Sequence, residues 1–211
     1  NKRAAIRQYQ KELEDNHKKI AKKISDSYFE ETGIKVVPTA DDILKYQLWE
    51  EQKHKCLYTG DEISIADFIG TGSKYDIEHT VPRSRGGDDS QANKTLCNNR
   101  FNRDIKRAKL PSELSCIFDV KVRIEELGWE KKVEELEKQI AQQTKKSKVA
   151  TTKEAKDSAI RQRHYLKLKL DYWKDKIYRF NMTEINDGFT KRQGVDIGII
   201  SRYARMYLQK K

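Results

Sequence analysis

The chain has 211 residues, of which 36% are hydrophobic and 36% are charged, and its mean hydropathy is −0.94. Such a polar composition excludes one large globular core and favours long solvated helices around a small compact unit. The 44 Lys and Arg residues against 33 Asp and Glu residues give a net charge of +11, which favours a polyanionic partner such as nucleic acid or an acidic membrane surface. No apolar run approaches the roughly 20 residues of a membrane-spanning helix, so we expect no membrane segment.

Two helices are predicted at the start of the chain. Residues 1–32 carry apolar side chains at helical spacing among Lys, Glu and Gln residues, and Gly33 is typical of a helix stop. Thr39, with Asp42 three residues later, predicts the cap of a second helix. We therefore expect residues 1–52 to form one long helix and a second, shorter helix.

The sequence changes in character over residues 53–115, where glycines cluster and the segments become shorter. Alternation of apolar and polar residues over 75–81 predicts a strand, and residues 94–97 predict a second strand after a loop rich in Gly and Asp. Asn98 then suits the N-cap of a basic helical segment. Strand, loop, strand and helix in this order predict a compact ββα unit.

Helical periodicity returns in the last part of the chain. One apolar stripe runs over 124–140 and a second over 166–180, and the polar stretch 144–153 between them predicts a turn or flexible loop. The two stripes predict an antiparallel helical hairpin within 116–180 that packs on the compact unit, with a partner-binding coiled coil as the alternative. Residues 181–211 are expected to form a connector and a final helix. The predicted fold class is thus α+β and mostly helical.

A carboxylate and an imidazole are neighbours at Glu78 and His79, and Asn102 follows on the basic helical segment. Because consecutive strand side chains face opposite sides, Glu78 and His79 share a cleft only if the strand ends or bends there, and Pro82 favours such an ending. Carboxylate and amide oxygens are hard ligands suited to Mg²⁺, and a neutral imidazole can accept a proton from water near pH 7. Together with the basic surroundings, these residues indicate metal-dependent cleavage of a phosphodiester.

Other polar residues are expected to support this site. Asn93 is predicted to tie the loop together through backbone hydrogen bonds, and Asp76 to support the site from the first strand. Asp88 and Asp89 are rival candidates for metal ligands, although capping of the loop is the more common role. The residues predicted to bind nucleic acid are Lys94, Arg103, Lys106 and Arg107.

Several segments carry a resemblance to a known family. Four segments of the chain closely resemble the HNH domain of type II CRISPR RNA-guided DNA endonucleases. They are Tyr75-Asp-Ile-Glu-His-Thr-Val-Pro82, Asp88-Asp-Ser-Gln-Ala-Asn-Lys-Thr-Leu96, Asn102-Arg103 and Pro111-Ser-Glu113. The stretches Asp187–Gln193 and Ile199–Arg205 are similar to the family's linker into a RuvC-like domain, and residues 1–32 to the linker that precedes the HNH domain. The resemblance covers essentially the whole chain, and since the chain does not begin with Met, we expect a piece of a longer protein.

The resemblance implies roles for the candidate residues. His79 falls on the general base, Glu78 and Asn102 fall on the ligands of one Mg²⁺, with Mn²⁺ as a substitute, and Lys106 falls near the DNA path. The family usually carries Asp where this chain has Glu78, and the added methylene leaves the ligand type unchanged. Many HNH enzymes hold a structural zinc with Cys-x-x-Cys pairs; this chain has single thiols at Cys56 and Cys97, so no zinc is predicted.

The resemblance also implies partners and a location. The domain would cut the target DNA strand within an RNA–DNA heteroduplex, with the guide RNA held by the full-length enzyme and a RuvC-like domain in the same chain. An inhibitor protein is a further candidate partner, no membrane is involved, and the prokaryotic cytoplasm is the expected location. The alternatives are a stand-alone HNH nuclease, or a catalytically inactive scaffold that binds nucleic acid or forms a coiled coil.

Overall fold

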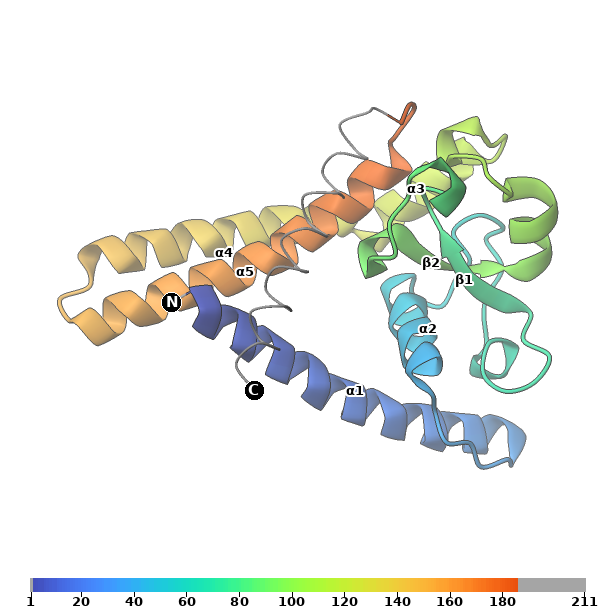
Figure 1. Ribbon diagram of the computed structural model, residues 1–211, viewed down its shortest axis with the longest axis horizontal. Coiled ribbons are helices and arrows are strands. Elements are labelled where there is room, and N and C mark those ends of the chain that lie inside the picture. The colour runs from blue at the N-terminus through green and yellow to red at the C-terminus, as the bar shows by residue number, and fades with distance from the viewer. Residues whose placement is uncertain (1, 186–211) are drawn as a thin grey trace, which may run out of the picture.

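The computed structural model describes residues 2–185, which fold into long helices around a small antiparallel sheet (Figure 1). The predicted α+β, mostly helical class is confirmed. Within this described part, no helix is both long and apolar enough to cross a membrane. The predicted connector and final helix fall largely outside the described residues.

The first two helices have the predicted boundaries. Helix α1 (Lys2–Thr32) ends at Gly33, whose φ of 71° suits a residue without a side chain. Helix α2 (Ala40–Glu51) begins with a capping box. In that box, the Thr39 hydroxyl accepts a hydrogen bond from the Asp42 N–H at 3.2 Å, and the Asp42 carboxylate accepts one from the Thr39 N–H at 2.8 Å. Local sequence signals are sufficient at both places.

Strands β1 (Tyr75–His79) and β2 (Lys94–Asn98) form the two-stranded sheet, with the first residue of β1 opposite the last residue of β2. The buried side chain of Gln52 attaches the end of α2 to this sheet. Its Oε1 accepts a hydrogen bond from the Leu96 N–H at 2.7 Å, and its Nε2 donates to the Leu96 carbonyl at 3.0 Å. At Leu96, the outer edge of β2 is therefore paired by the side chain of the residue that caps α2.

Asn98 caps the segment that follows β2, as predicted, and its Oδ1 accepts hydrogen bonds from the N–H groups of Arg100 and Phe101 at 3.1 and 3.2 Å. The segment then continues as a π-helical turn, Phe101–Lys106, which is wound more widely than an α-helix. The rest of the compact unit contains four short 3₁₀ turns: Ile65–Asp67, Arg83–Arg85, Gln91–Asn93 and Pro111–Glu113.

The predicted helical hairpin is present, but its boundaries differ. It consists of α4 (Trp129–Val149) and α5 (Lys153–Phe180), and α3 (Ile117–Leu127) precedes it. Gly128, with a φ of 70°, separates α3 from α4, so the first predicted stripe belongs to two helices. The predicted loop at 144–153 was too long, because α4 continues to Val149. Serine and threonine hydroxyls within this stretch hydrogen-bond to helix carbonyls at 2.8 Å and so are compatible with the helix.

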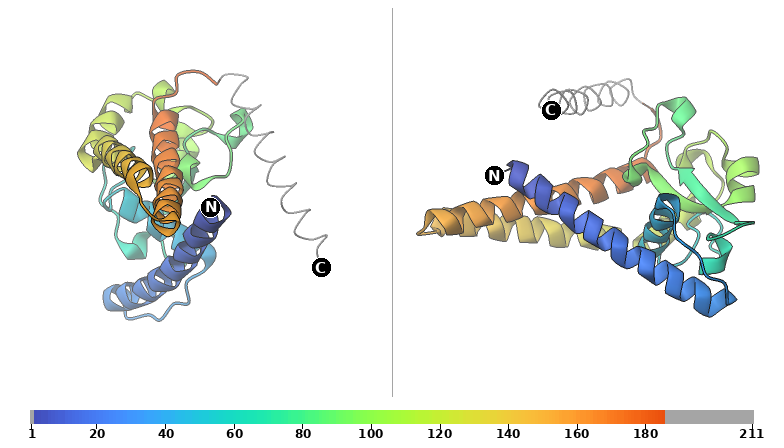
Figure 2. Two further views of the ribbon diagram at one scale, coloured as in Figure 1. Left: turned by 90° about the vertical axis from the view of Figure 1, so that its left-hand side faces the viewer. Right: turned by 60° about the horizontal axis from the view of Figure 1, so that its bottom comes forward.

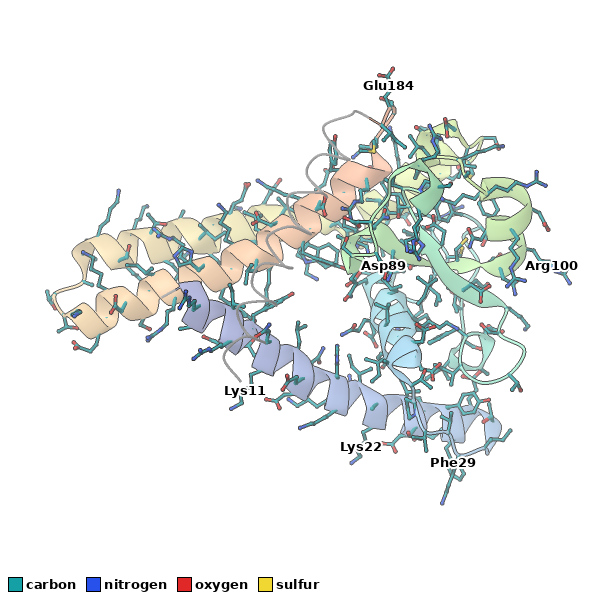
Figure 3. The ribbon with its side chains drawn as sticks, in the orientation of Figure 1. Lys11, Lys22, Phe29, Asp89, Arg100 and Glu184 are labelled. Carbon is teal, nitrogen blue, oxygen red and sulfur yellow. The ribbon has the colours of Figure 1, made fainter. Side chains whose placement is uncertain are left out.

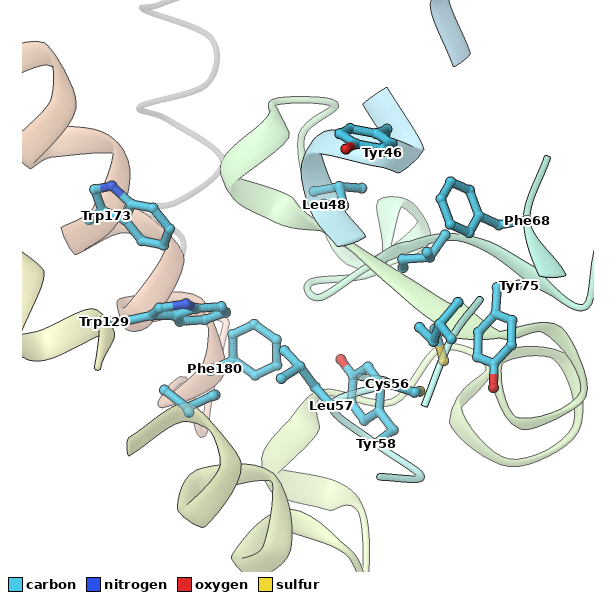
Figure 4. Close-up of a cluster of buried hydrophobic side chains, with 14 of the residues drawn as sticks. Tyr46, Leu48, Cys56, Leu57, Tyr58, Phe68, Tyr75, Trp129, Trp173 and Phe180 are labelled. Atoms are coloured by element: carbon cyan, nitrogen blue, oxygen red, sulfur yellow. The ribbon is translucent and has the colours of Figure 1, made fainter. Parts of the chain in front are cut away.

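The hairpin and the compact unit share one hydrophobic core. Trp129 contacts both Trp173 and Phe180, with ring centroids 5.6 and 5.9 Å apart, and Phe180 in turn lies 6.2 Å from the ring of Tyr58 (Figure 4). These aromatic rings bury apolar surface at the junction, and they join the start of α4 and the end of α5 to the sheet region.

Helix α1 runs from the hairpin to the compact unit (Figure 2). Near its start, the ring of Tyr9 packs edge-to-face on Tyr165 of α5 at 5.9 Å, and the Tyr165 hydroxyl donates a hydrogen bond to Glu12. Near its end, the Tyr28 hydroxyl lies close to Gly70. The helix therefore spans both parts of the molecule.

Candidate active site

His79 is the last residue of β1, and its side chain is 22% exposed. Its Nε2 lies 2.9 Å from Oδ1 of Asp89, and the same oxygen lies 2.9 Å from Nζ of Lys94. The hydrogen bonds from His79 and Lys94 lower the pKa of Asp89 to about 2. We refer to these three residues as the His79 cluster. Asp89 lies where α5 meets the sheet (Figure 3).

The loop that carries Asp89 is fixed by buried hydrogen bonds. The Oδ1 atom of Asn93 accepts a hydrogen bond from the Val81 N–H at 2.8 Å. The Nδ2 atom of Asn93 donates hydrogen bonds to the carbonyls of Val81 and Asp88 at 2.9 and 2.8 Å. These are the backbone hydrogen bonds that the sequence analysis expected of Asn93. At Gly87, a Cβ atom would lie 1.8 Å from the Val81 carbonyl oxygen, so the chain can pass there only without a side chain. The conformation of this loop is thus determined by the Asn93 hydrogen bonds and by the close approach at Gly87.

Two buried cations at the end of α5 hold this region from the other side. Arg179 donates from Nη2 to Asp88 at 2.9 Å and from Nη1 to the Ser90 hydroxyl at 3.0 Å. One turn earlier, Lys176 donates to the Lys94 carbonyl at 2.8 Å. Both side chains are almost completely buried. These contacts could not be predicted from the sequence, since each joins residues more than 80 positions apart and no local pattern marks it.

Glu78 points into the core, on the opposite side of β1 from His79. Its side chain is fully buried, and its Oε2 accepts hydrogen bonds from the hydroxyls of Thr95 at 2.6 Å and Tyr58 at 3.1 Å. The predicted open cleft shared by Glu78 and His79 is therefore wrong. The strand stays regular through His79, and the ordinary alternation of strand side chains separates them.

Lys106 is also buried, which contradicts its predicted contact with DNA. The residue is 1% exposed, its Nζ lies 2.5 Å from Oε1 of Glu78, and it donates to the His79 carbonyl at 2.9 Å. The contact between Lys106 and Glu78 is an ion pair, but its angles are not those of a hydrogen bond. The Oε1 atom of Glu78 therefore has no hydrogen-bond donor among the described residues. The predicted contact of Lys94 with DNA is contradicted in the same way, because its side chain is only 11% exposed and forms an ion pair with Asp89. A buried lysine cannot reach a phosphate backbone.

The remaining predicted residues lie on β1 and in or beside the π-helical turn. Asp76 accepts from Arg103 at 2.6 Å, which ties β1 to this turn. The half-buried Asn102 side chain makes no hydrogen bond to another described residue, so its amide oxygen is available. Arg103 and Arg107 are exposed, and so is Arg100 on the side away from the hairpin (Figure 3). These three arginines can face a polyanion.

The predicted ligands Glu78 and Asn102 are of types that suit a hard divalent cation, although the charge of Glu78 is already neutralised by Lys106. A carboxylate and an amide oxygen are the donors that Mg²⁺ prefers. Glu78 has an oxygen without a hydrogen-bond donor, and the Lys106 ammonium stands in as its cation. Among residues 2–185, no three His, Cys, Asp or Glu side chains gather into a metal site, so a metal here would depend on the amide of Asn102.

Two thiols that are far apart in the sequence meet in the core. Cys56 and Cys97 are completely buried and share a hydrogen bond. That hydrogen bond and burial raise the pKa of the Cys97 thiol. Their spacing in the sequence does not pair the two cysteines, because only the tertiary fold brings β2 next to Cys56.

Residues 56–112 match the sequence profile of the HNH endonuclease family. The chain is 46% identical over 52 residues to CRISPR-associated endonuclease Cas9 1 of Streptococcus thermophilus, which is 25% of this chain and 5% of the relative. It is 37% identical over 84 residues to CRISPR-associated endonuclease Cas9 of Campylobacter jejuni, which is 40% of this chain and 8% of the relative. The chain thus spans a small part of the curated relatives that it matches.

A solved structure is also similar. The crystal structure of Streptococcus thermophilus Cas9 in complex with the AGAA PAM aligns with 59% of this chain and 13% of that chain, at a TM-score of 0.48 and 27% sequence identity.

Proposed function

The chain belongs to the HNH domains of type II CRISPR Cas9-like endonucleases, and on this premise we propose that it hydrolyses the DNA strand that pairs with the guide RNA, with His79 as the general base. The observation that carries this proposal is the place of His79. The residue closes β1 at the surface, and its ring is held from one side by Asp89. A positioned imidazole of this kind can take the proton of an attacking water near neutral pH.

HNH endonucleases generally use a divalent metal ion, and for this chain we propose Mg²⁺, with Mn²⁺ as a substitute. Glu78 and Asn102 would hold it once the Glu78 side chain leaves its buried pair with Lys106, because in the described structure this carboxylate faces the core, away from His79. When bound, the ion would neutralise the negative charge that develops on the scissile phosphate. Its binding would compete with the Lys106 ammonium for the Glu78 carboxylate, because both are cations that require the same oxygen.

The nucleic-acid surface that we propose consists of exposed arginines. Arg103 lies in the π-helical turn, and Arg100 and Arg107 flank its two ends. All three side chains are exposed, whereas those of Lys94 and Lys106 are buried. The target sequence would be read by base pairing with the guide RNA, which the full-length enzyme holds together with a RuvC-like domain, and this domain would contact the backbone. Such an enzyme would act in the prokaryotic cytoplasm, and an inhibitor protein is a further candidate partner.

Substitution of Arg107 tests this surface. Arg107→Ala should weaken DNA binding by the full-length enzyme about equally for all target sequences, and it should reduce the slope of log affinity against log salt by about 1. Arg107→Lys keeps the charge and should retain most of the slope. A changed preference among target sequences in filter-binding or fluorescence titrations would contradict a backbone contact.

The function itself is tested with the full-length parent enzyme and a guide-matched duplex whose strands carry different labels. Asn102→Ala should stop the cutting of the guide-paired strand while the other strand is still nicked, and metal chelation should stop that cutting in the wild type until Mg²⁺ is returned. The Asn102 side chain makes no hydrogen bond to another described residue, and the backbone hydrogen bond from Arg107 to the Asn102 carbonyl does not need that side chain, so its loss should leave the fold intact. Asp104→Ala, an exposed change on the same π-helical turn, is the matched control. Unchanged cutting of the guide-paired strand by Asn102→Ala would refute the assignment of Asn102, and unchanged cutting after chelation would refute the metal.

A further inference from the structure

We propose that Asp89 is a positioning residue for His79, which fixes the imidazole with its proton on Nε2 and leaves Nδ1 to accept the proton of the attacking water. This inference rests on the proposed function and deepens it. The sequence suggested Asp89 only as a rival metal ligand or a loop cap, whereas in the structure its carboxylate is the polar group in hydrogen-bonding contact with the ring.

The acceptor chemistry of Asp89 determines which nitrogen carries the proton. Its Oδ1 lies 2.9 Å from both His79 Nε2 and Lys94 Nζ. An ammonium group can only donate a hydrogen bond, and an ionised carboxylate can only accept one. The short contact to Nε2 therefore requires an N–H at that position. In the neutral ring the other nitrogen, Nδ1, is then the base, since the hydrogen bond at one nitrogen sets the tautomer.

The position of Asp89 is determined by its neighbours on both sides. Asp88 is held by Arg179 from α5 and by the Asn93 amide, and Ser90 is held by Arg179. Lys94, which shares the Asp89 oxygen, has its own carbonyl held by Lys176. The carboxylate is therefore presented at a fixed place although 65% of its side chain is exposed.

The reaction that follows is balanced within the site. As the water oxygen forms its bond to phosphorus, one water proton moves to Nδ1 of His79, and the bond from phosphorus to the leaving sugar oxygen breaks. The leaving oxygen takes a proton from solvent. The imidazolium that forms is stabilised by the Asp89 carboxylate on its opposite side, in the way that a carboxylate assists the histidine of a hydrolase.

Variants of Asp89 in the full-length enzyme test this role. Asp89→Ala should slow the cutting of the guide-paired strand by about 10- to 100-fold, as the loss of a hydrogen-bonding partner that orients a histidine at a metal site typically does. Asp89→Asn should be slowed less, because the amide oxygen still accepts from Nε2. Added formate should restore part of the Asp89→Ala rate. The dependence on DNA concentration should not change, because Asp89 touches the histidine and not the substrate.

Cutting of the other strand by the same enzyme molecules is the internal control for folding and DNA binding, and Asp104→Ala is the matched control for loss of an exposed acid. Wild-type cutting by Asp89→Ala, together with inactivity of His79→Ala, would overturn the positioning role and leave the proposed function standing. Equal losses in Asp89→Ala and Asp89→Asn, without formate rescue, would also overturn it, because Asp89 would then only hold the loop. Undiminished cutting by His79→Ala would instead remove the proposed function itself.

Discussion

Replacing His79 by alanine should slow the cutting of the guide-paired strand by about 10²- to 10⁴-fold, the usual contribution of a general base. The imidazole is the titratable group that closes β1 at the surface, and among the residues that touch it, Asp89 is an ionised acceptor and Lys94 a paired donor. Neither can replace it as a base near pH 7. The rate is measured in single-turnover cleavage by the full-length enzyme with separately labelled strands.

The fold should survive this substitution. Removing the ring leaves the Asp89–Lys94 ion pair and the Asn93 hydrogen bonds in place, so the melting temperature should stay close to that of the wild type. His17→Ala, on the exposed surface of α1, is the matched histidine control and should cut both strands normally. If His79→Ala cut the guide-paired strand at the wild-type rate, the base would have to be sought elsewhere.

Replacing Lys106 by alanine should lower the free energy of unfolding by about 3–5 kcal/mol, because it leaves the carboxylate of Glu78 buried without a cation. Both side chains are sealed from solvent, so water cannot compensate for the lost charge. Urea denaturation followed by circular dichroism measures the change. The opposite expectation, from a solvated DNA-binding lysine, is a change within about 0.5 kcal/mol.

Two further variants test whether the loss of stability in Lys106→Ala comes from the burial of an unpaired charge. Lys174→Ala removes an ion pair with Glu137 in which both partners are about half exposed, and it should cost no more than about 1 kcal/mol. In the double variant Glu78→Gln with Lys106→Met, no buried charge remains, so much of the lost stability should return. A Lys106→Ala variant as stable as Lys174→Ala would show that Glu78 does not depend on Lys106.

The parts of the fold that the sequence predicted are those with local causes. The cap at Thr39, the stop at Gly33 and the cap at Asn98 each depend on residues within four positions of one another, and the structure has all three. The first strand followed from the alternation over 75–81, and the second from the short segment 94–97 after the loop rich in Gly and Asp. The break at Gly128 was missed because the apolar stripe continues across it.

The candidate site was harder to predict because its environment is not local. A lysine in a basic segment is normally solvated, and the burial of Lys106 depends on Glu78, 28 positions away, and on a π-helical winding that no periodicity rule anticipates. Similarly, Asp89 was considered as a metal ligand or a loop cap. Its contact with His79 arises only when Asn93 and Arg179 fold the loop back.

The packing of α1 on α5 has a consequence for synthesis. The hydrogen bond from Tyr165 to Glu12 joins residues 153 positions apart. At a translation rate of roughly 5–20 residues per second, the first helix leaves the ribosome roughly 8 to 30 seconds before its partner is made. During that interval the polar side chains of α1 must keep it soluble, and the final packing of the shared core must wait until α5 has emerged.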